Sequence, residues 1–127
     1  MELPVASQWC GVESVDDRIL SFTEPHVHPI FSAKMFLVKG RDADLVVDSG
    51  MGIAPLRPAI DAPRVEPAKP LILLTTHTHE DHIGAAHEFE TRLVHSPEAG
   101  DQADPAPYSL DSRDIPKRLR ELFLSAG

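Results

Sequence analysis

Short hydrophobic runs separated by polar turns dominate the first half of the chain. Residues 18–23 (RILSFT), 34–39 (KMFLVK) and 44–48 (DLVVD) each have the length and the β-branched or aromatic content of a strand. The third run stops at Ser49 and Gly50, a pair of residues typical of turns. Three strands joined by short connections predict a meander.

After these strands, the pattern alternates between strands and helices. We expect residues 53–60 to form an irregular helix, since Pro55 and Pro58 interrupt it, and residues 62–70 to form a surface connection. Residues 71–76 (LILLTT) are nearly all apolar or β-branched, which predicts a strand buried on both faces.

A further helix is expected to begin near Asp81 or His82, because apolar positions then recur at helical spacing. Residues 92–95 (RLVH) predict a short strand, and residues 96–107 a helical turn and a loop. Asp114 is the expected N-cap of a last helix. Its apolar stripe consists of Ile115, Leu119, Leu122 and Phe123. This order of elements is typical of an α/β (α+β) fold with a mixed sheet.

Composition and charge limit the function. The 127 residues suffice for one domain, and twelve Lys and Arg against twenty Asp and Glu give a formal charge of −8. Such an acidic surface repels phosphate backbones, so we expect no nucleic-acid partner. Cys10 is the only cysteine, which fits a cytoplasmic protein. No signal peptide is visible and the longest apolar run is LILL, so no membrane partner is expected.

The densest group of titratable residues lies in TTHTHEDHIGAA, residues 75–86, where the buried strand is predicted to end. Alternate residues of an extended chain share a face, so His77 and His79 are expected to point the same way. Asp81 and His82 follow at the entry to the next helix. Imidazole nitrogens and carboxylate oxygens bind zinc, so this HxHxDH spacing predicts two adjacent metal sites. Two metals about 3.5–4 Å apart can share a hydroxide that is nucleophilic near neutral pH.

Other chemistry has less support in the sequence. The zinc-protease pattern HExxH begins at His79, but its second histidine would fall at Ile83. Nucleophilic catalysis by Cys10 or Ser49 has no positioned base.

These residues resemble the metallo-β-lactamase fold superfamily. THTHEDHIG resembles its signature loop, and LVVDSGMG (residues 45–52) resembles the aspartate–glycine turn that precedes it. RLVHSPEAG resembles the following strand and loop of glyoxalase II-like and thioesterase-like members. The resemblance covers residues 19–99 and implies an αββα sandwich with its metal loops along one edge of paired sheets.

The resemblance also implies roles for individual residues. His77 and His79 would bind the first metal, and Asp81 and His82 the second, with zinc expected and iron or manganese as alternatives. Asp81 would in addition orient the attacking hydroxide or accept its proton. Asp48 resembles the aspartate that hydrogen-bonds the metal loop without binding metal, and the alternative role is that of a turn former.

The other histidines and the basic run have simpler expected roles. His26 and His28 lie in a loop that can overhang the substrate groove in this family, but we expect them to be solvated. His87 is expected on a helix surface and His95 at the end of a strand. The basic residues of the last helix are expected to face solvent. They are Lys117, Arg118 and Arg120.

Members of this family complete their metal sites with a third histidine, a bridging aspartate and a last histidine farther along the chain. No histidine follows His95, so we expect residues 1–127 to be the N-terminal part of one such domain, inactive alone. The complete domain is expected to hydrolyse a small thioester, ester, lactone or lactam by means of a metal-bound hydroxide. The alternatives are a non-catalytic remnant that folds or associates without turnover, and a nuclease, which the acidic charge disfavours. The oligomeric state is left open.

Overall fold

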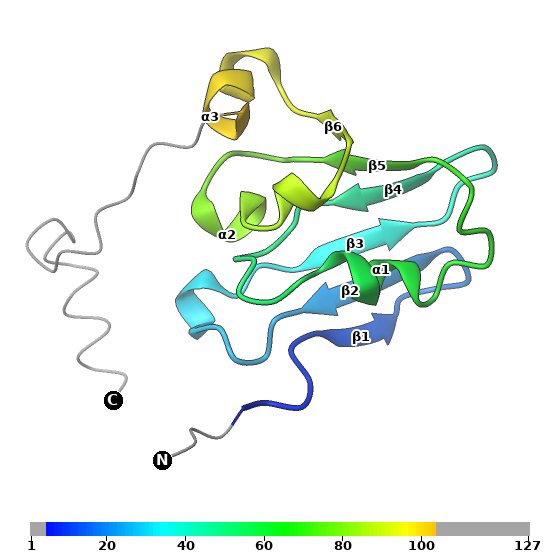
Figure 1. Cartoon of the computed structure of the whole chain (residues 1–127), viewed down its shortest axis with the longest axis horizontal. Coiled ribbons are helices and arrows are strands. Elements are labelled where there is room, and N and C mark those ends of the chain that lie inside the picture. Colours follow the sequence, from blue (N-terminus) through cyan, green and yellow to red (C-terminus); the bar gives the residue numbers. More distant parts are fainter. Residues whose placement is uncertain (1–4, 104–127) are drawn as a thin grey trace, which may run out of the picture.

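A mixed β-sheet organises the part of the chain that the structure, a computed structural model, describes, which is residues 5–103. The strands follow one another across the sheet in chain order (Figure 1). Neighbours from β1 to β4 are antiparallel, whereas β5 joins β4 and β6 joins β5 in parallel. The strands are β1 (Gly11–Ser14), β2 (Ile19–Thr23), β3 (Met35–Val38), β4 (Asp44–Val47), β5 (Leu71–Leu74) and β6 (Thr91–Leu93).

The predicted meander is confirmed, and β1 extends it by one strand. Its sequence, GVES, gives little signal because Val12, Glu13 and Ser14 are all exposed. The turn that returns the chain to β2 is closed by Asp16, whose Oδ1 accepts the N–H groups of Arg18 and Ile19, at 2.8 Å each. The strand therefore depends on a side chain in the turn rather than on burial.

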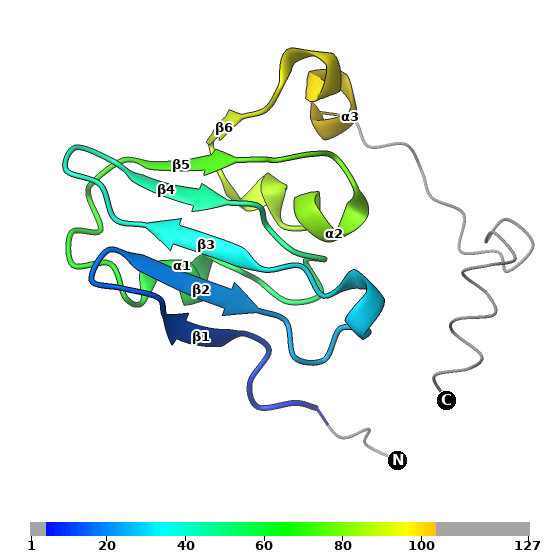
Figure 2. The ribbon, with the colours of Figure 1, turned by 180° about the vertical axis from the view of Figure 1, so that it is seen from behind.

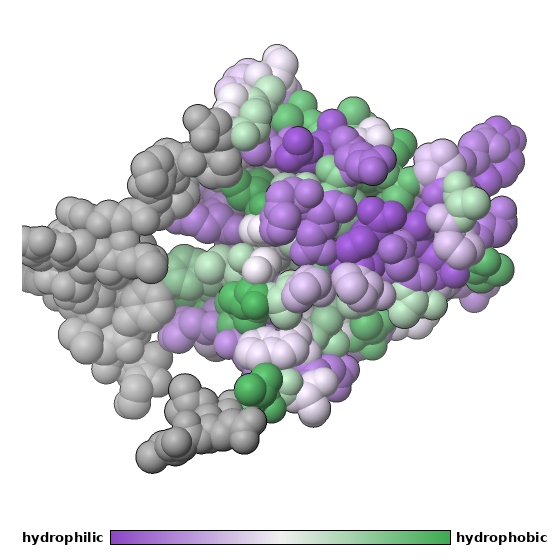
Figure 3. Space-filling model, viewed as in Figure 1, coloured by the Kyte–Doolittle hydropathy of each residue, from purple (hydrophilic) through white to green (hydrophobic). Residues whose placement is uncertain are grey.

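Helical segments cover one face of the sheet. Alternate residues of β2 to β5 are fully buried there, and they pack against residues that follow the strands. The strand residues are Phe22, Met35, Leu37, Val46 and Leu73, and their partners are Leu56, Ile60, Ala85, Ala86 and Phe89. Hydrophilic residues (purple) cover much of the outer surface on this side (Figure 3).

Two predicted helices are shorter than expected. The first is α1 (Arg57–Asp61), which starts after Pro55 and whose first N–H groups bond to the carboxylate of Glu88. The second is α2 (Glu80–Ile83), which is followed by a separate 3-10 turn, η2 (Ala86–Glu88). Helices η1 (Pro29–Phe31), η3 (Ser96–Glu98) and α3 (Ala99–Ala103) complete the described chain. No helix in residues 5–103 is long and apolar enough to cross a membrane.

The opposite face of the sheet is apolar and only partly buried. Phe36, Val47, Leu74 and Leu93 form one row across β3 to β6, and 51% of Leu93 is exposed. Figure 2 views this face, with α1 behind the sheet. The expectation that residues 71–76 are buried on both faces is therefore wrong for β5, because within residues 5–103 the helices cover one face only. One sheet with helices on one face is half of an αββα sandwich.

A buried ion cluster lies at the end of the sheet where β4 begins. Nε of Arg64 lies 2.9 Å from Oδ2 of Asp44, and both side chains are at most 2% exposed. Nζ of Lys69 lies 3.0 Å from Oδ1 of the same carboxylate. Burial alone would raise the pKa of Asp44, but hydrogen bonds from Arg64 and Lys69, with the charge of Lys69, lower it overall.

The predicted last helix, from Asp114 onward, lies outside the described residues.

Candidate metal centre

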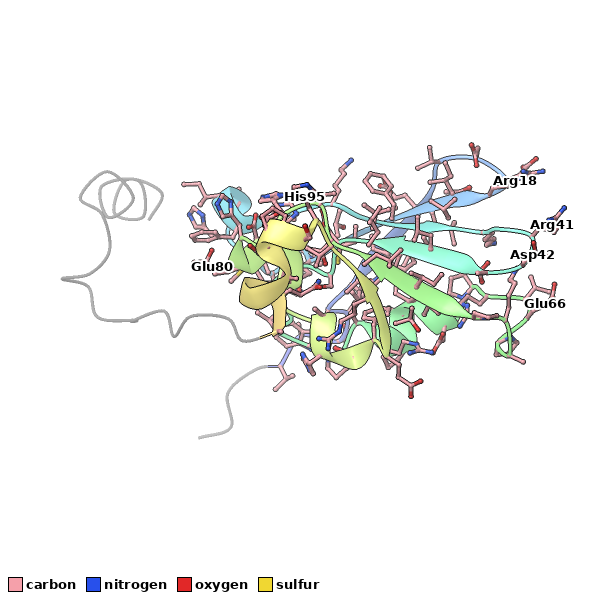
Figure 4. All side chains as sticks on the ribbon, turned by 90° about the horizontal axis from the view of Figure 1, so that it is seen from above. Arg18, Arg41, Asp42, Glu66, Glu80 and His95 are labelled. Atoms are coloured by element: carbon pink, nitrogen blue, oxygen red, sulfur yellow. The ribbon has the colours of Figure 1, made fainter. Side chains whose placement is uncertain are left out.

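The HxHxDH residues lie at one end of the sheet, just past the carboxyl ends of β4 and β5. These two strands are parallel, with Val47 paired to Leu74, so the residues that follow each strand meet at the same edge. Glu80 and His95 mark this end in Figure 4, whereas Arg41, Asp42 and Glu66 lie at the other. The parallel pairing of β4 and β5 therefore brings Asp48 to the loop that follows β5.

The structure brings the four predicted ligands together. The ring centroids of His77 and His79 are 4.7 Å apart, and those of His77 and His82 are 3.9 Å apart. Nε2 of His82 lies 3.4 Å from Oδ2 of Asp81. Both predicted pairs thus have their side chains close to one another. The contacts are pairwise, and His77 also lies beside His82 of the other predicted pair.

Asp48 forms hydrogen bonds to Thr76 and to His82. It is 4% exposed, and its φ of +60° is unusual for a residue other than glycine. Oδ1 accepts the backbone N–H of Thr76 at 2.8 Å, and Oδ2 accepts the Thr76 hydroxyl at 2.7 Å. Oδ2 also lies 2.8 Å from Nδ1 of His82. The carboxylate therefore makes three hydrogen bonds to two residues of the segment 75–82, which contains the predicted ligands and is called the metal loop below.

These hydrogen bonds set the proton positions on two imidazoles. A carboxylate only accepts, so Nδ1 of His82 donates to Asp48, and a neutral imidazole then has its Nε2 lone pair available for a ligand. The hydroxyl of Thr76 gives its one proton to Asp48, so it accepts from Nδ1 of His77, 3.0 Å away. The Nε2 atom of His77 is then left as an acceptor too. Such partners orient metal-binding histidines and raise their basicity.

The backbone of the loop after β4 fixes α2 in place. The N–H and the hydroxyl of Ser49 both donate to the carbonyl of His82, at 2.9 and 3.0 Å. The N–H of Gly84 donates to the carbonyl of Gly50 at 2.7 Å. A Cβ on Gly84 would lie 2.1 Å from the carbonyl group of Met51, so only glycine permits this approach. The position of His82 thus follows from the turn that also holds Asp48.

The side chains of this cluster are of types that bind divalent metals. They are arranged as two pairs rather than as one larger set of ligands. Two imidazoles are available to one ion, and an imidazole with a carboxylate to a second, which are ligands that zinc accepts. Within residues 5–103, no three His, Cys, Asp or Glu side chains are grouped around one point as ligands. Each ion would therefore need ligands beyond these pairs.

The other candidates have different surroundings. Burial raises the pKa of the Cys10 thiol, and the charge of Glu24 raises it further, which disfavours a thiolate nucleophile. Nε2 of His26 lies 3.0 Å from the carbonyl of Gln8, and Nδ1 of His28 accepts the N–H of Ile30. His28 thus holds its own loop, whereas His26 joins that loop to the N-terminal segment. His87 is exposed in η2, as expected, and His95, also exposed, lies two residues after β6.

Thr76 is the residue of this centre that sequence analysis missed. It is 28 residues from Asp48, and threonine has no pattern that marks it as a partner of a distant carboxylate. Only its place before His77, within the quoted motif, could have drawn attention to it.

Comparison with known proteins identifies the family. The sequence model of the metallo-β-lactamase superfamily matches residues 29–118, more than half of the chain, and the chain therefore belongs to this superfamily. The acyl-coenzyme A thioesterase MBLAC2 of Homo sapiens is 28% identical over an alignment of 124 residues, which covers 87% of this chain and 44% of that protein. The Gallus gallus protein of the same name is 38% identical over an alignment of 100 residues, which covers 74% of this chain and 36% of that protein. The chain thus spans less than half the length of these relatives.

Solved structures agree with the fold. A metallo-β-lactamase from Pontibacter korlensis superposes with a TM-score of 0.62 at 15% identity, covering 80% of this chain and 51% of that one. The metallo-β-lactamase FIM-1 from Pseudomonas aeruginosa, in its mono-zinc form, gives a TM-score of 0.57 at 14% identity, covering 74% and 45%. At these identities the likeness concerns the fold alone.

Proposed function

We propose that this chain supplies the first half of the active site of a metal-dependent hydrolase that acts on thioesters. The observation that carries the proposal is the contact of Asp48 with both Thr76 and His82, which leaves Nε2 of His77 and of His82 as acceptors. The relatives named acyl-coenzyme A thioesterases favour a thioester over an ester, lactone or lactam.

In this proposal, His77 and His79 would hold one divalent ion, and Asp81 and His82 a second. Zinc, when bound, supplies Lewis-acid activation of water and polarises the carbonyl of the substrate. Asp81 carries a half-buried carboxylate beside His82, 19% exposed, that can orient a water molecule or accept its proton. Asp48 keeps its neighbours in the orientation that ligands need.

Metal analysis and turnover together test this function. The complete domain, in which this chain supplies the first half of the active site, should retain zinc after dialysis and should cleave an acyl-coenzyme A faster than a lactone or a β-lactam of similar size. Asp81→Asn keeps the shape of the side chain and removes its charge. Since general acid–base groups contribute roughly 10²–10⁴-fold, turnover should fall by that range.

A second function, a non-catalytic half-domain, is favoured by the absence of a three-ligand group within residues 5–103. It predicts a folded protein without hydrolysis above that of free zinc, in every substrate class. That result in the complete domain, or a normal rate in its Asp81→Asn variant, would contradict the proposed hydrolase. The cytoplasmic location and the absence of nucleic-acid and membrane partners stay predictions.

A further inference from the structure

A second carboxylate, from the helical segment that follows β6, contacts the metal loop. Oε1 of Glu98, in η3, accepts the backbone N–H of Thr78 at 3.1 Å and its hydroxyl at 3.2 Å. Thr78 lies between His77 and His79, so both donors belong to the residue that separates two predicted ligands. The contact spans 20 residues of sequence.

A second side chain, four residues after Glu98, also forms a hydrogen bond to the metal loop. Nε2 of Gln102, in α3, donates to Oγ1 of Thr75. Gln102 is 7% exposed and Thr75 is 3% exposed. Residues four apart lie on one face of a helix, so Glu98 and Gln102 present one polar face of residues 96–103 to the loop. Two hydrogen-bonded side chains therefore join residues 96–103 to the metal loop.

The loop is thereby held from two sides. Asp48 accepts the N–H of Thr76, and Glu98 accepts the N–H of Thr78. These N–H groups lie on either side of His77, so both carboxylates together restrict the backbone that orients this imidazole. Hydrogen bonds to a charged acceptor contribute about twice as much as neutral ones.

We propose that Glu98 is a positioning residue of the metal centre, which holds Thr78 so that His77 and His79 present their nitrogens to one ion. The inference rests on the proposed function, since it assumes a metal at this loop. A purely structural anchor would affect the stability of the fold and leave metal affinity unchanged.

The chain contains a matched control. Glu88 also accepts two N–H groups, from Leu56 at 3.0 Å and Arg57 at 2.6 Å, but it does so at the start of α1. Glu88→Ala therefore removes a carboxylate with the same kind of bonding from a place that does not touch the metal loop. Glu98→Gln removes the charge of Glu98 and keeps an acceptor oxygen.

The test measures zinc affinity by chelator competition in the full chain, together with hydrogen exchange of the Thr78 amide in the metal-free state. Residues that support ligands typically contribute about 10–100-fold, so Glu98→Ala should weaken zinc binding by that factor and speed Thr78 exchange. Glu98→Gln should restore part of both effects. Glu88→Ala should lower the free energy of unfolding and leave zinc affinity within twofold.

Three results would overturn the inference. The first is a Glu98→Ala variant whose zinc affinity matches that of Glu88→Ala. The second is an equal loss of affinity in Glu98→Gln and Glu98→Ala with unchanged Thr78 exchange, which would show that only charge matters. The third is a wild-type chain that binds no zinc at all, which would contradict the proposed function itself. In that case Thr78 exchange still shows separately whether the Glu98 contact forms.

Discussion

Oδ2 of Asp48 lies 2.8 Å from Nδ1 of His82, although 34 residues separate them in the sequence. The parallel pairing of β4 and β5 creates this contact, because both residues follow neighbouring strands at one edge of the sheet. The same oxygen accepts the hydroxyl of Thr76, which in turn contacts His77. One buried carboxylate therefore orients two of the four predicted metal ligands.

Replacing Asp48 by asparagine should weaken zinc binding about 10–100-fold without unfolding the chain. Asparagine tolerates the φ of +60° at this position, so the backbone is not strained, but its amide has one acceptor oxygen and cannot replace both carboxylate oxygens that bond to Thr76 and His82. The measurement is a zinc titration with thermal unfolding as the control. An unchanged affinity with a lower melting temperature would show that Asp48 is only a turn residue.

Thr76→Val removes the hydroxyl that links Asp48 to His77 and keeps the shape of the side chain. His77 is then free to adopt either tautomer, so we expect weaker zinc binding, within the range of about 10–100-fold found for supporting residues. Thr91→Val, on the exposed start of β6, is the control for loss of a threonine hydroxyl. Equal affinities in both variants would contradict the tautomer argument.

Gly84→Ala should destabilise the fold, since its Cβ would meet the carbonyl group of Met51 at 2.1 Å and that of Gly50 at 2.6 Å. Overpacking of this kind typically costs about 1–3 kcal/mol, measured here by urea unfolding. Gly100→Ala in α3 is the control, because a Cβ there has nothing within 4 Å. Alanine at that position should be neutral or stabilising by up to about 1 kcal/mol. Similar unfolding midpoints for both variants would show that α2 does not depend on this contact.

Asp44 should make the fold sensitive to acid. Its pKa in the folded chain lies below the ordinary value of 3.8, because the hydrogen bonds from Arg64 and Lys69 outweigh the effect of burial. A depressed carboxyl pKa gives stability that is fully present well above pH 3.8 and is lost as the pH falls through the folded pKa. Titration of the Asp44 carboxyl carbon by NMR measures this directly. A value at or above the ordinary one would contradict the ion cluster.

The sequence predicted much of this fold because its strands have strong local patterns. Residues 34–39 and 44–48 each contain a short run of apolar residues, and β3 and β4 lie within these segments. Residues 71–76 predicted β5, but their burial depends on layers that pattern alone does not place. The exposed strand β1 was missed because its pairing depends on a turn at Asp16. The helix after the cluster was predicted too long, since Gly84 packs against a distant turn that no local spacing reveals.

The four predicted ligands were found together because their spacing is local, on one loop and one helix turn. Their partners could not be found in the same way. Thr76 and Glu98 act through contacts across neighbouring strands, and only the parallel arrangement of β4, β5 and β6 brings them to the loop. The proton positions on His77 and His82 depend on Thr76 and Asp48, so they too needed the structure.

The measurement that tests the central claim most directly is the position of zinc in a crystal of the zinc-loaded protein, located by anomalous scattering at the zinc edge. We expect zinc at about 2.0–2.2 Å from Nε2 of His77 and from a nitrogen of His79. Asp81 and His82 should bind a second ion at similar distances. Nδ1 of His82 should keep its contact with Asp48. Zinc bound elsewhere, or bound through the Nδ1 atoms of His77 and His82, would contradict it.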